Sequence, residues 1–160
     1  MRLVVVAVGR ASRLLEPALA EYAERAGRYW NLEILEVREE RAGRGRSEED
    51  VRSAEAERMI KRVPRDSDIV AVTRNGAEWS STRLAEHLRQ HVLESGRPET
   101  YVIGGAYGLG DAVMGAAHRE MSLSAFTMPH DLARLVLLEQ LYRAGTILRG
   151  EPYHKGSDAR

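Results

Sequence analysis

Short apolar runs alternate with longer segments of helical periodicity along this chain, and this alternation restricts the fold more than any other feature. Strands are expected at residues 3–8, 32–37, 68–72, 101–103 and 123–128, and helices at 14–25, 48–63, 82–94, from 111 onward, and from 131 to about 148. Strands joined through helices form right-handed crossovers, which place helices on both faces of the sheet. The sequence therefore predicts an α/β fold with a mostly parallel sheet.

Helix starts are indicated by residues that suit a first turn. Pro17 lies near the start of the first helix, and Ser47 is expected to cap the helix that begins at residue 48. Ser80 or Ser81 is expected to cap the next helix, and Asp131 the last one. Because the 160 residues contain no repeat, low-complexity tract or linker, one domain spanning residues 1–160 is expected.

The composition excludes several kinds of chemistry. The chain has no cysteine, which rules out disulfides, thiolate nucleophiles and cysteine-ligated zinc. Its 24 basic and 24 acidic side chains cancel, so an anionic partner such as RNA must be met by a local basic patch. The apolar start is too short to cross a membrane, and no signal peptide is evident. We expect a cytoplasmic protein without a membrane partner.

The glycine-rich segment 104–110 follows a strand and is the first candidate for a binding site. It does not match a phosphate-binding loop, because Asp111 stands where a lysine is required, nor a dinucleotide fingerprint, because Val113 replaces the third glycine. An ordinary strand-to-helix turn remains the alternative. Open α/β sheets bind ligands at the carboxyl ends of their strands, and glycines let the main chain approach a ligand closely. We therefore favour a small-molecule site here.

A second candidate loop, residues 122–130, leads directly into the last helix. Its start reads as the fifth strand, which Met128 and Pro129 are expected to end because proline cannot donate to a ladder. His130 stands beside this loop at the start of the last helix. We expect the two loops to converge on one ligand held mainly by backbone groups.

Basic and titratable residues elsewhere allow two interpretations each. Arg38, Arg41, Arg44 and Arg46 lie in a glycine-containing segment that is either a solvated loop or an arm for RNA phosphate. Tyr153, His154 and Lys155 form either a frayed terminus or a group that stacks on a base, moves a proton and meets phosphate. His87 and His91, four residues apart on a helix, lack a third metal ligand, and a solvated helix face is the favoured interpretation.

The last helix is apolar around most of its circumference, unlike a surface helix with one apolar stripe. Its apolar residues are Leu132, Leu135, Val136, Leu137, Leu138, Leu141 and Tyr142. One face is expected to pack on the sheet. The other is covered either within the same chain or, as we favour, by a second copy in a homodimer.

Five motifs occur in the order in which they are found in a known family. They are Ile103–Leu109, Ser122–Ser124 with Thr127–His130, Leu132–Arg134, Leu138–Ala144 and Pro152–Lys155. The chain resembles, over its whole length, the RlmH family of bacterial enzymes, which methylate the N(3) atom of a pseudouridine in large-subunit (23S) ribosomal RNA. This family belongs to the SPOUT class of methyltransferases.

The resemblance implies a deep trefoil knot in the C-terminal part, a homodimer, and S-adenosylmethionine as the cofactor, with no metal. The implied cofactor contacts are Val72, Gly104, Gly105, Leu123, Ser124, Ala125, Phe126, Thr127 and Met128. Val72, Ala106, Gly110 and Phe126 depart from the residues usual in the family, which backbone-mediated binding should tolerate.

The resemblance also suggests roles in catalysis. The N(3) proton of pseudouridine must be lost, so a proton acceptor or a group that stabilises the anion is needed. His154 or Tyr153 is expected to contact the base, with His130 as an alternative proton acceptor. Arg134 and Arg143 would steady the anion or nearby phosphates, and Arg41, Arg44, Arg46 and Lys155 would hold RNA within the large subunit or whole ribosome. Ribose 2′-O-methylation, a non-catalytic ribosome-binding protein and a nucleotide-binding module remain the alternatives.

Overall fold

The computed structural model describes residues 1–43 and 45–154, except for the side chain of His154. Its elements are β1 (Arg2–Val8), α1 (Glu16–Gly27), β2 (Asn31–Val37), α2 (Glu48–Ile60), β3 (Asp68–Glu78), α3 (Ser81–Glu94), β4 (Glu99–Ile103), α4 (Asp111–Ala116), β5 (Arg119–Ser122), α5 (His130–Leu148) and a 3₁₀ turn, η1 (Pro152–His154). The five strands pair in parallel in the order β2-β1-β4-β3-β5. The predicted α/β fold is therefore confirmed; the implied knot and the single domain stay predictions.

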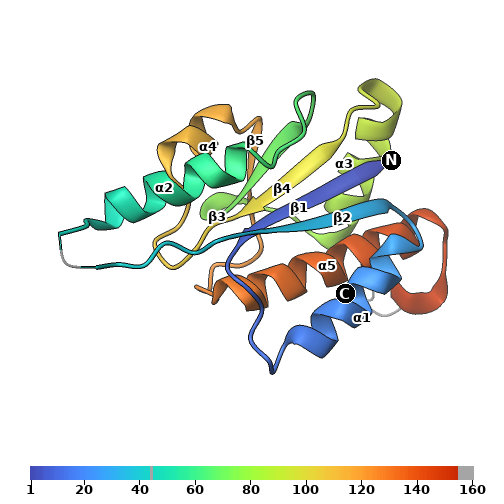
Figure 1. Cartoon of the computed structure of the whole chain (residues 1–160). Helices are drawn as coiled ribbons and strands as arrows, with labels where there is room; N and C mark the ends of the chain where they lie inside the picture. Colours follow the sequence, from blue (N-terminus) through green and yellow to red (C-terminus); the bar gives the residue numbers. More distant parts are fainter. Residues whose placement is uncertain (44, 155–160) are drawn as a thin grey trace.

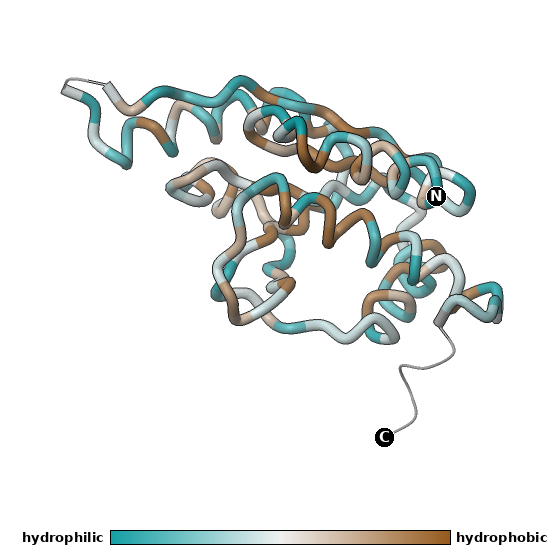
Figure 2. Tube along the Cα trace, turned by 90° about the horizontal axis from the view of Figure 1, so that it is seen from below, coloured by the Kyte–Doolittle hydropathy of each residue, from teal (hydrophilic) through white to brown (hydrophobic). Residues whose placement is uncertain are grey.

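Helices cover both faces of the sheet, as the alternating pattern predicted (Figure 1). Successive residues of a strand point to opposite faces, so Val4, Val6 and Val8 of β1 pack with α2 and α4, whereas Leu3 and Val5 pack with α1, α3 and α5. Hydrophobic and hydrophilic stretches alternate along the helical parts of the trace (Figure 2). This is expected when a helix buries one face and exposes the other.

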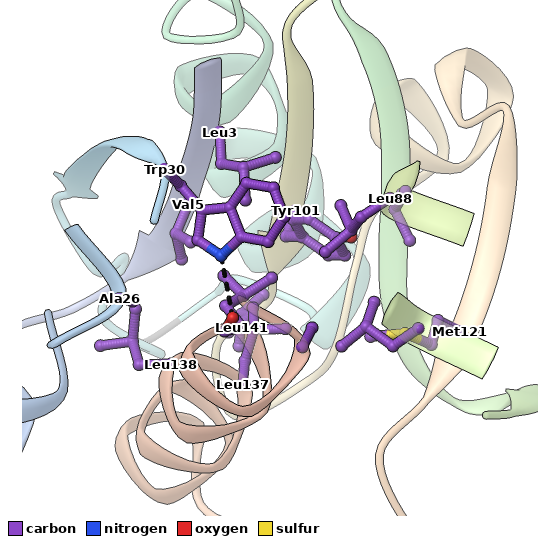
Figure 3. Close-up of a cluster of buried hydrophobic side chains, with 14 of the residues drawn as sticks. Leu3, Val5, Ala26, Trp30, Leu88, Tyr101, Met121, Leu137, Leu138 and Leu141 are labelled. Carbon is purple, nitrogen blue, oxygen red and sulfur yellow. Dashed lines mark hydrogen bonds between the residues drawn. The ribbon is translucent and has the colours of Figure 1, made fainter. Parts of the chain in front are cut away.

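The larger core lies between the sheet and α5. Leu137, Leu138 and Leu141 of this helix are fully buried against Tyr101 and the other residues labelled in Figure 3. The indole of Trp30 donates a hydrogen bond of 2.8 Å to the carbonyl oxygen of Leu141, so its polar atom is satisfied inside the core (Figure 3). This core fixes α5 relative to the carboxyl ends of the strands.

The α5 helix also packs against α1 and α3 of the same chain. Its flanks are therefore partly covered without a second copy, while Leu132 and Leu148 at its two ends remain exposed. The homodimer stays a prediction.

The predicted caps are partly right. Ser47 accepts the Asp50 N–H in a capping box, and Ser80, rather than Ser81, accepts the Arg83 N–H. The prediction for Asp131 is wrong: α5 begins at His130 without a side-chain cap. The Asp131 carboxylate instead accepts the N–H of Ser12 at 3.2 Å, which ties the loop after β1 to the start of α5.

The predicted fifth strand at 123–128 is also wrong. The strand β5 is Arg119–Ser122, and residues 123–128 form a loop. β5 pairs with β3, which is longer than predicted and has an irregular register between Val72 and Ala77. The backbones approach so closely there that a Cβ on Gly76 would lie 2.6 Å from the carbonyl carbon of Met121. This pairing releases residues 123–128 to line a pocket.

The interpretation of His87 and His91 as a solvated face is wrong as well. The His87 ring lies 2.6 Å from the carboxylate of Glu99, a side chain that is fully buried at the start of β4. His91 is buried and contacts the carbonyl oxygen of Arg97 at 3.1 Å. Tyr101 donates its hydroxyl to the other oxygen of Glu99 at 2.5 Å. The Nδ1 of His91 also lies 3.6 Å from the Glu99 carboxylate. Two histidines and a tyrosine thus surround this buried group, and such polar partners offset the cost of removing it from water.

Candidate functional site

A pocket of about 670 Å³ lies at the carboxyl end of β4, next to the point where the pairing of β4 with β3 ends. Four segments form most of its wall: residues 72–75 of β3, the glycine loop 103–109, the loop after β5, and the start of α5. Glu48 and Arg52 of α2, Met114 of α4 and Glu120 of β5 complete it. Parallel α/β sheets characteristically bind ligands at this end of the strands, and the volume is in the range of small-molecule sites.

Most of the predicted cofactor residues meet in this pocket. Those that line it are Val72, Gly104, Gly105, Leu123, Ser124, Phe126, Thr127 and Met128, together with His130, whereas Ala125 does not. Phe126 is 84% exposed, which leaves an aromatic face at the pocket available to a planar ligand. The structure therefore brings together two loops that the sequence only suggested were neighbours; their role as cofactor contacts stays a prediction.

The glycine loop folds so tightly that side chains could not be accommodated at some of its positions. A Cβ on Gly104 would lie 2.5 Å from both the carbonyl carbon and the carbonyl oxygen of Gly108. Gly108 has a φ of +83°, a backbone conformation that favours glycine, and its N–H donates to the carbonyl of Gly105 at 3.1 Å. The loop folds back on itself and leaves main-chain groups at the pocket wall.

The loop after β5 is held by its own serines. Ser122 donates its hydroxyl to the carbonyl of Ser124 at 3.0 Å, and the hydroxyl of Ser124 accepts the N–H of Phe126 at 3.0 Å. Side chains of serine commonly stabilise tight turns in this way. The polar and apolar residues that were expected to form the fifth strand here instead form a turn.

Sequence reasoning missed the charged residues contributed by β3 and β5. Arg74 lies within 3.4 Å of the Thr127 hydroxyl, and Glu120 within 3.4 Å of the Thr73 hydroxyl, at one side of the pocket. The irregular register of β3 places residues 73–75 there. No pattern in the sequence predicts such an irregularity, because it depends on the pairing of two distant strands.

His130 stands at the border of the pocket against the loop that follows β1. Its Nε2 would lie 3.0 Å from a Cβ on Gly9, a residue with a φ of +77°. The close approach and the positive φ both require glycine at position 9. Of the predicted catalytic residues, His130 is the one that the described structure places at the pocket.

Arg143 and Tyr153 lie elsewhere on the same chain. Both bind Glu139: Arg143 donates from Nη2 at 2.6 Å, and the Tyr153 hydroxyl donates at 3.1 Å. The guanidinium of Arg143 also lies over the Tyr153 ring, 4.9 Å from its centroid. Arg143 stands thirteen positions after His130 in α5, which corresponds to roughly 20 Å along the helix. These residues therefore reach a pocket only if a second copy of the chain presents them.

The predicted RNA-binding residues are dispersed. Arg41 is exposed, and Arg46 pairs with Glu40, which also binds Arg58. Arg134 is buried, and its Nη1 donates to Glu36 at 2.7 Å. Arg44, Lys155 and the side chain of His154 lie outside the described residues.

A buried carboxylate supports the glycine loop from behind. Glu55 of α2 is 2% exposed; its Oε1 accepts the N–H of Glu40 at 2.9 Å, and its Oε2 has no hydrogen-bond partner within the described part of the chain. A Cβ on Gly105 would lie 2.7 Å from that Oε2. Burial raises the pKa of the Glu55 carboxyl above its ordinary value, and the Glu40 N–H opposes part of this rise.

The raised pKa predicts a pH-dependent effect of Glu55→Gln. Between the ordinary and the raised pKa the folded state binds more protons than the unfolded state, so the free energy of unfolding falls as the pH rises through this window. Glutamine cannot ionise and keeps an acceptor for Glu40. We expect Glu55→Gln to have a higher free energy of unfolding than the wild type at alkaline pH, and this difference to shrink as the pH falls below the ordinary glutamate pKa.

Urea unfolding at several pH values measures this difference. Glu57→Gln, on the exposed side of the same helix, is the matched control and should show no comparable pH-dependent gain. An equal effect of the two substitutions at every pH would contradict the role assigned to Glu55.

Two further features are absent from residues 1–43 and 45–154. No group of three or more histidine, cysteine, aspartate or glutamate side chains in this part is arranged to hold a metal ion. No helix in it has the length and apolar character needed to cross a membrane.

Comparison with known proteins agrees with this geometry. A family described as predicted SPOUT methyltransferase matches residues 1–154. A structure described as a probable methyltransferase from Bordetella pertussis shares the fold, with a TM-score of 0.54 and 14% identity over 89% of this chain and 95% of that one. At this identity the likeness supports the fold alone.

Proteins named ribosomal RNA large subunit methyltransferase H are similar in sequence. Those of Gemmatimonas aurantiaca and of an Anaeromyxobacter species are 47% and 49% identical, each over 97% of this chain and the whole of the relative. That of Bacillus pumilus is 37% identical over the same shares. The chain therefore belongs to the SPOUT methyltransferase family, in the group of ribosomal RNA large subunit methyltransferase H.

Proposed function

We propose that this protein methylates the N(3) atom of a pseudouridine in 23S ribosomal RNA, within the large subunit or the whole ribosome, using S-adenosylmethionine. The names of the similar proteins support a ribosomal RNA substrate. The observation that carries the proposal is the convergence of the glycine loop, the loop after β5 and His130 on one pocket. Ribosomal RNA as substrate would place the protein in the cytoplasm.

The pocket suits S-adenosylmethionine, which would supply an electrophilic methyl group when bound. The bare backbone around Gly104 gives a ligand access to main-chain donors and acceptors. Arg74 and Glu120 give the pocket both signs of charge, which the carboxylate and the ammonium of an amino-acid moiety require. Phe126 offers an exposed ring for stacking on a base.

The chain's own chemical task is to remove a proton from the nucleophile. The imide nitrogen of pseudouridine carries a hydrogen, so bond formation at N(3) requires a proton acceptor within hydrogen-bond reach. His130 lines the pocket, and a neutral imidazole has one ring nitrogen that can accept a proton. Tyr153 and His154 are the other residues expected to contact the base, and they would act from a second copy of the chain.

Action across a dimer predicts complementation between two inactive variants. Gly104→Val should destroy the pocket, and a chain ending at Glu151 should lack the tail. In a mixed dimer, one intact pocket would face one intact tail, so random mixing should restore about one quarter of the wild-type activity. Methyl transfer to ribosomes that lack the modification is the measurement; a different affinity tag on each variant, with purification over both tags, verifies mixed dimers. No restored activity in verified mixed dimers would contradict action across the dimer.

Titration calorimetry with S-adenosylmethionine and S-adenosylhomocysteine tests the proposed function, followed by mass spectrometry of the methylated nucleotide. Saturable binding and a methyl group on N(3) are expected. A methyl group on a ribose oxygen would favour 2′-O-methylation instead. Absence of binding to the folded protein would favour a non-catalytic ribosome-binding protein.

A further inference from the structure

A basic groove lies beside the proposed cofactor pocket, on the other side of the contact between Gly9 and His130. It consists of two adjoining hollows of about 640 and 630 Å³ that share Arg10 and Glu36. The first is walled by the loop after β1, by α1, β2 and α5, and the second by the end of β2 and residues 38–41. In Figure 1 the chain leaves β1, runs past the start of α5 and enters α1. Residues of this stretch line the groove, and none of them lines the pocket.

The charges of the groove favour an anion. Its cationic residues are Arg10, Arg13, Arg38, Arg41 and Arg134, and its carboxylates are Glu16, Glu36 and Glu39. The groove thus carries more cations than carboxylates, although the whole chain has no formal net charge. Guanidinium groups match phosphate oxygens through paired N–H donors. A local excess of arginine is the feature that a neutral protein needs in order to hold RNA.

Arg134 gives a second, independent indication. It is 2% exposed, and beyond its bond to Glu36 its Nε and Nη2 have no hydrogen-bond partner among the described residues. A buried guanidinium with unmet donors is costly, and an anionic oxygen in the adjoining hollow is the acceptor that would satisfy it. Arg134 lines the first hollow.

The groove and the pocket are connected by direct contacts between the loop after β1 and the start of α5. Gly9 lines the second hollow and touches His130, which lines the pocket. One residue further along α5, Asp131 holds the N–H of Ser12 in the loop that carries Arg10 and Arg13. An RNA strand in the groove would therefore run past the border at which the target base enters the pocket.

We propose that this groove binds the phosphates of ribosomal RNA next to the target nucleotide, through Arg10, Arg13 and Arg134. The proposal rests on the proposed function, because it takes ribosomal RNA as the substrate. It adds Arg10 and Arg13, which no motif in the sequence indicated, and it gives the buried Arg134 an acceptor.

The salt dependence of RNA binding tests the groove. Arg10→Gln/Arg13→Gln removes two exposed cations that do not line the cofactor pocket. The control Arg28→Gln/Arg89→Gln removes two exposed arginines that line neither hollow and pair with Glu24 and Glu86 on their own helices. Binding of ribosomal large subunits that lack the modification is measured at several potassium chloride concentrations.

We expect the groove variant to bind the subunits roughly tenfold more weakly at moderate salt. The plot of log association constant against log salt concentration should be shallower, with the magnitude of its negative slope reduced by about 1.5, as expected for two lost phosphate contacts. The control should match the wild type, and all proteins should bind S-adenosylhomocysteine equally. If the groove variant kept the wild-type affinity for the subunits and the wild-type salt dependence, the proposal that the groove binds RNA would be overturned, while the methyltransferase proposal would remain intact. A change of oligomeric state at unchanged RNA affinity would also overturn it, and would make the groove a subunit interface.

Discussion

Gly104→Ala is expected to weaken the binding of S-adenosylmethionine by about 100-fold or more, which is the scale of loss that a displacement of about 1 Å causes in a site. The added Cβ would lie 2.5 Å from the carbonyl carbon and oxygen of Gly108, and both atoms belong to backbone rather than to a flexible side chain. Relief requires the loop to open, because Gly108 already occupies a conformation that favours glycine. Titration calorimetry with S-adenosylhomocysteine measures the loss.

The matched control for this prediction is Gly115→Ala. A Cβ on Gly115 in α4 meets no atom within 4 Å, and alanine is the better helix former, so neither folding nor cofactor binding should suffer. Circular dichroism should show both variants folded. Wild-type affinity in a folded Gly104→Ala protein would exclude the glycine loop from the cofactor site.

Glu99→Ala is expected to lower the free energy of unfolding by about 3 kcal/mol, because removal of one member of a buried charged network leaves its partners unpaired. Glu99 is fully buried and binds both His87 and the hydroxyl of Tyr101, which is itself fully buried. Burial and the neighbouring Glu99 carboxylate raise the pKa of Tyr101 well above its ordinary value, so this hydroxyl stays protonated and needs an acceptor.

Thermal unfolding should show a fall in Tm of about 10 °C for Glu99→Ala. Glu99→Gln keeps an acceptor for Tyr101 and should lose less. Cofactor binding by the folded fraction should be unchanged, because Glu99 stands at the opposite end of β4 from Gly104, roughly 17 Å along the strand. A wild-type Tm in Glu99→Ala would show that the network contributes no net stability.

The predicted elements were right wherever a local pattern decides the outcome. Apolar runs placed β1 and β2 to within one residue, and Ser47 marked the start of α2. The strand-and-helix alternation was enough to predict the parallel sheet, because parallel strands need crossovers of this length. The glycine loop was recognised because four glycines in seven residues remove side chains from a strand end.

The predictions failed where a distant partner decides the outcome. The residues after Ser122 alternate like a strand, yet β3 runs past an irregular register at Gly76 and pairs with residues 119–122 instead. His87 and His91 read as a polar helix face, yet the approach of β4 gives them a buried carboxylate to pair with. The histidine spacing contains no information about Glu99, which becomes their neighbour only when the sheet forms.

The sequence by itself determined the α/β class, the two loops of the pocket and, through the order of its motifs, the family. These features depend on local backbone preference and on hydrophobic periodicity, both of which can be read along the chain. Only the tertiary structure decided the strand order, the course of β3 and β5, the burial of Glu99 and Arg134, and the separation of His130 from Tyr153. These depend on which distant segments meet, and on which charges are thereby removed from water, a balance that no local segment fixes.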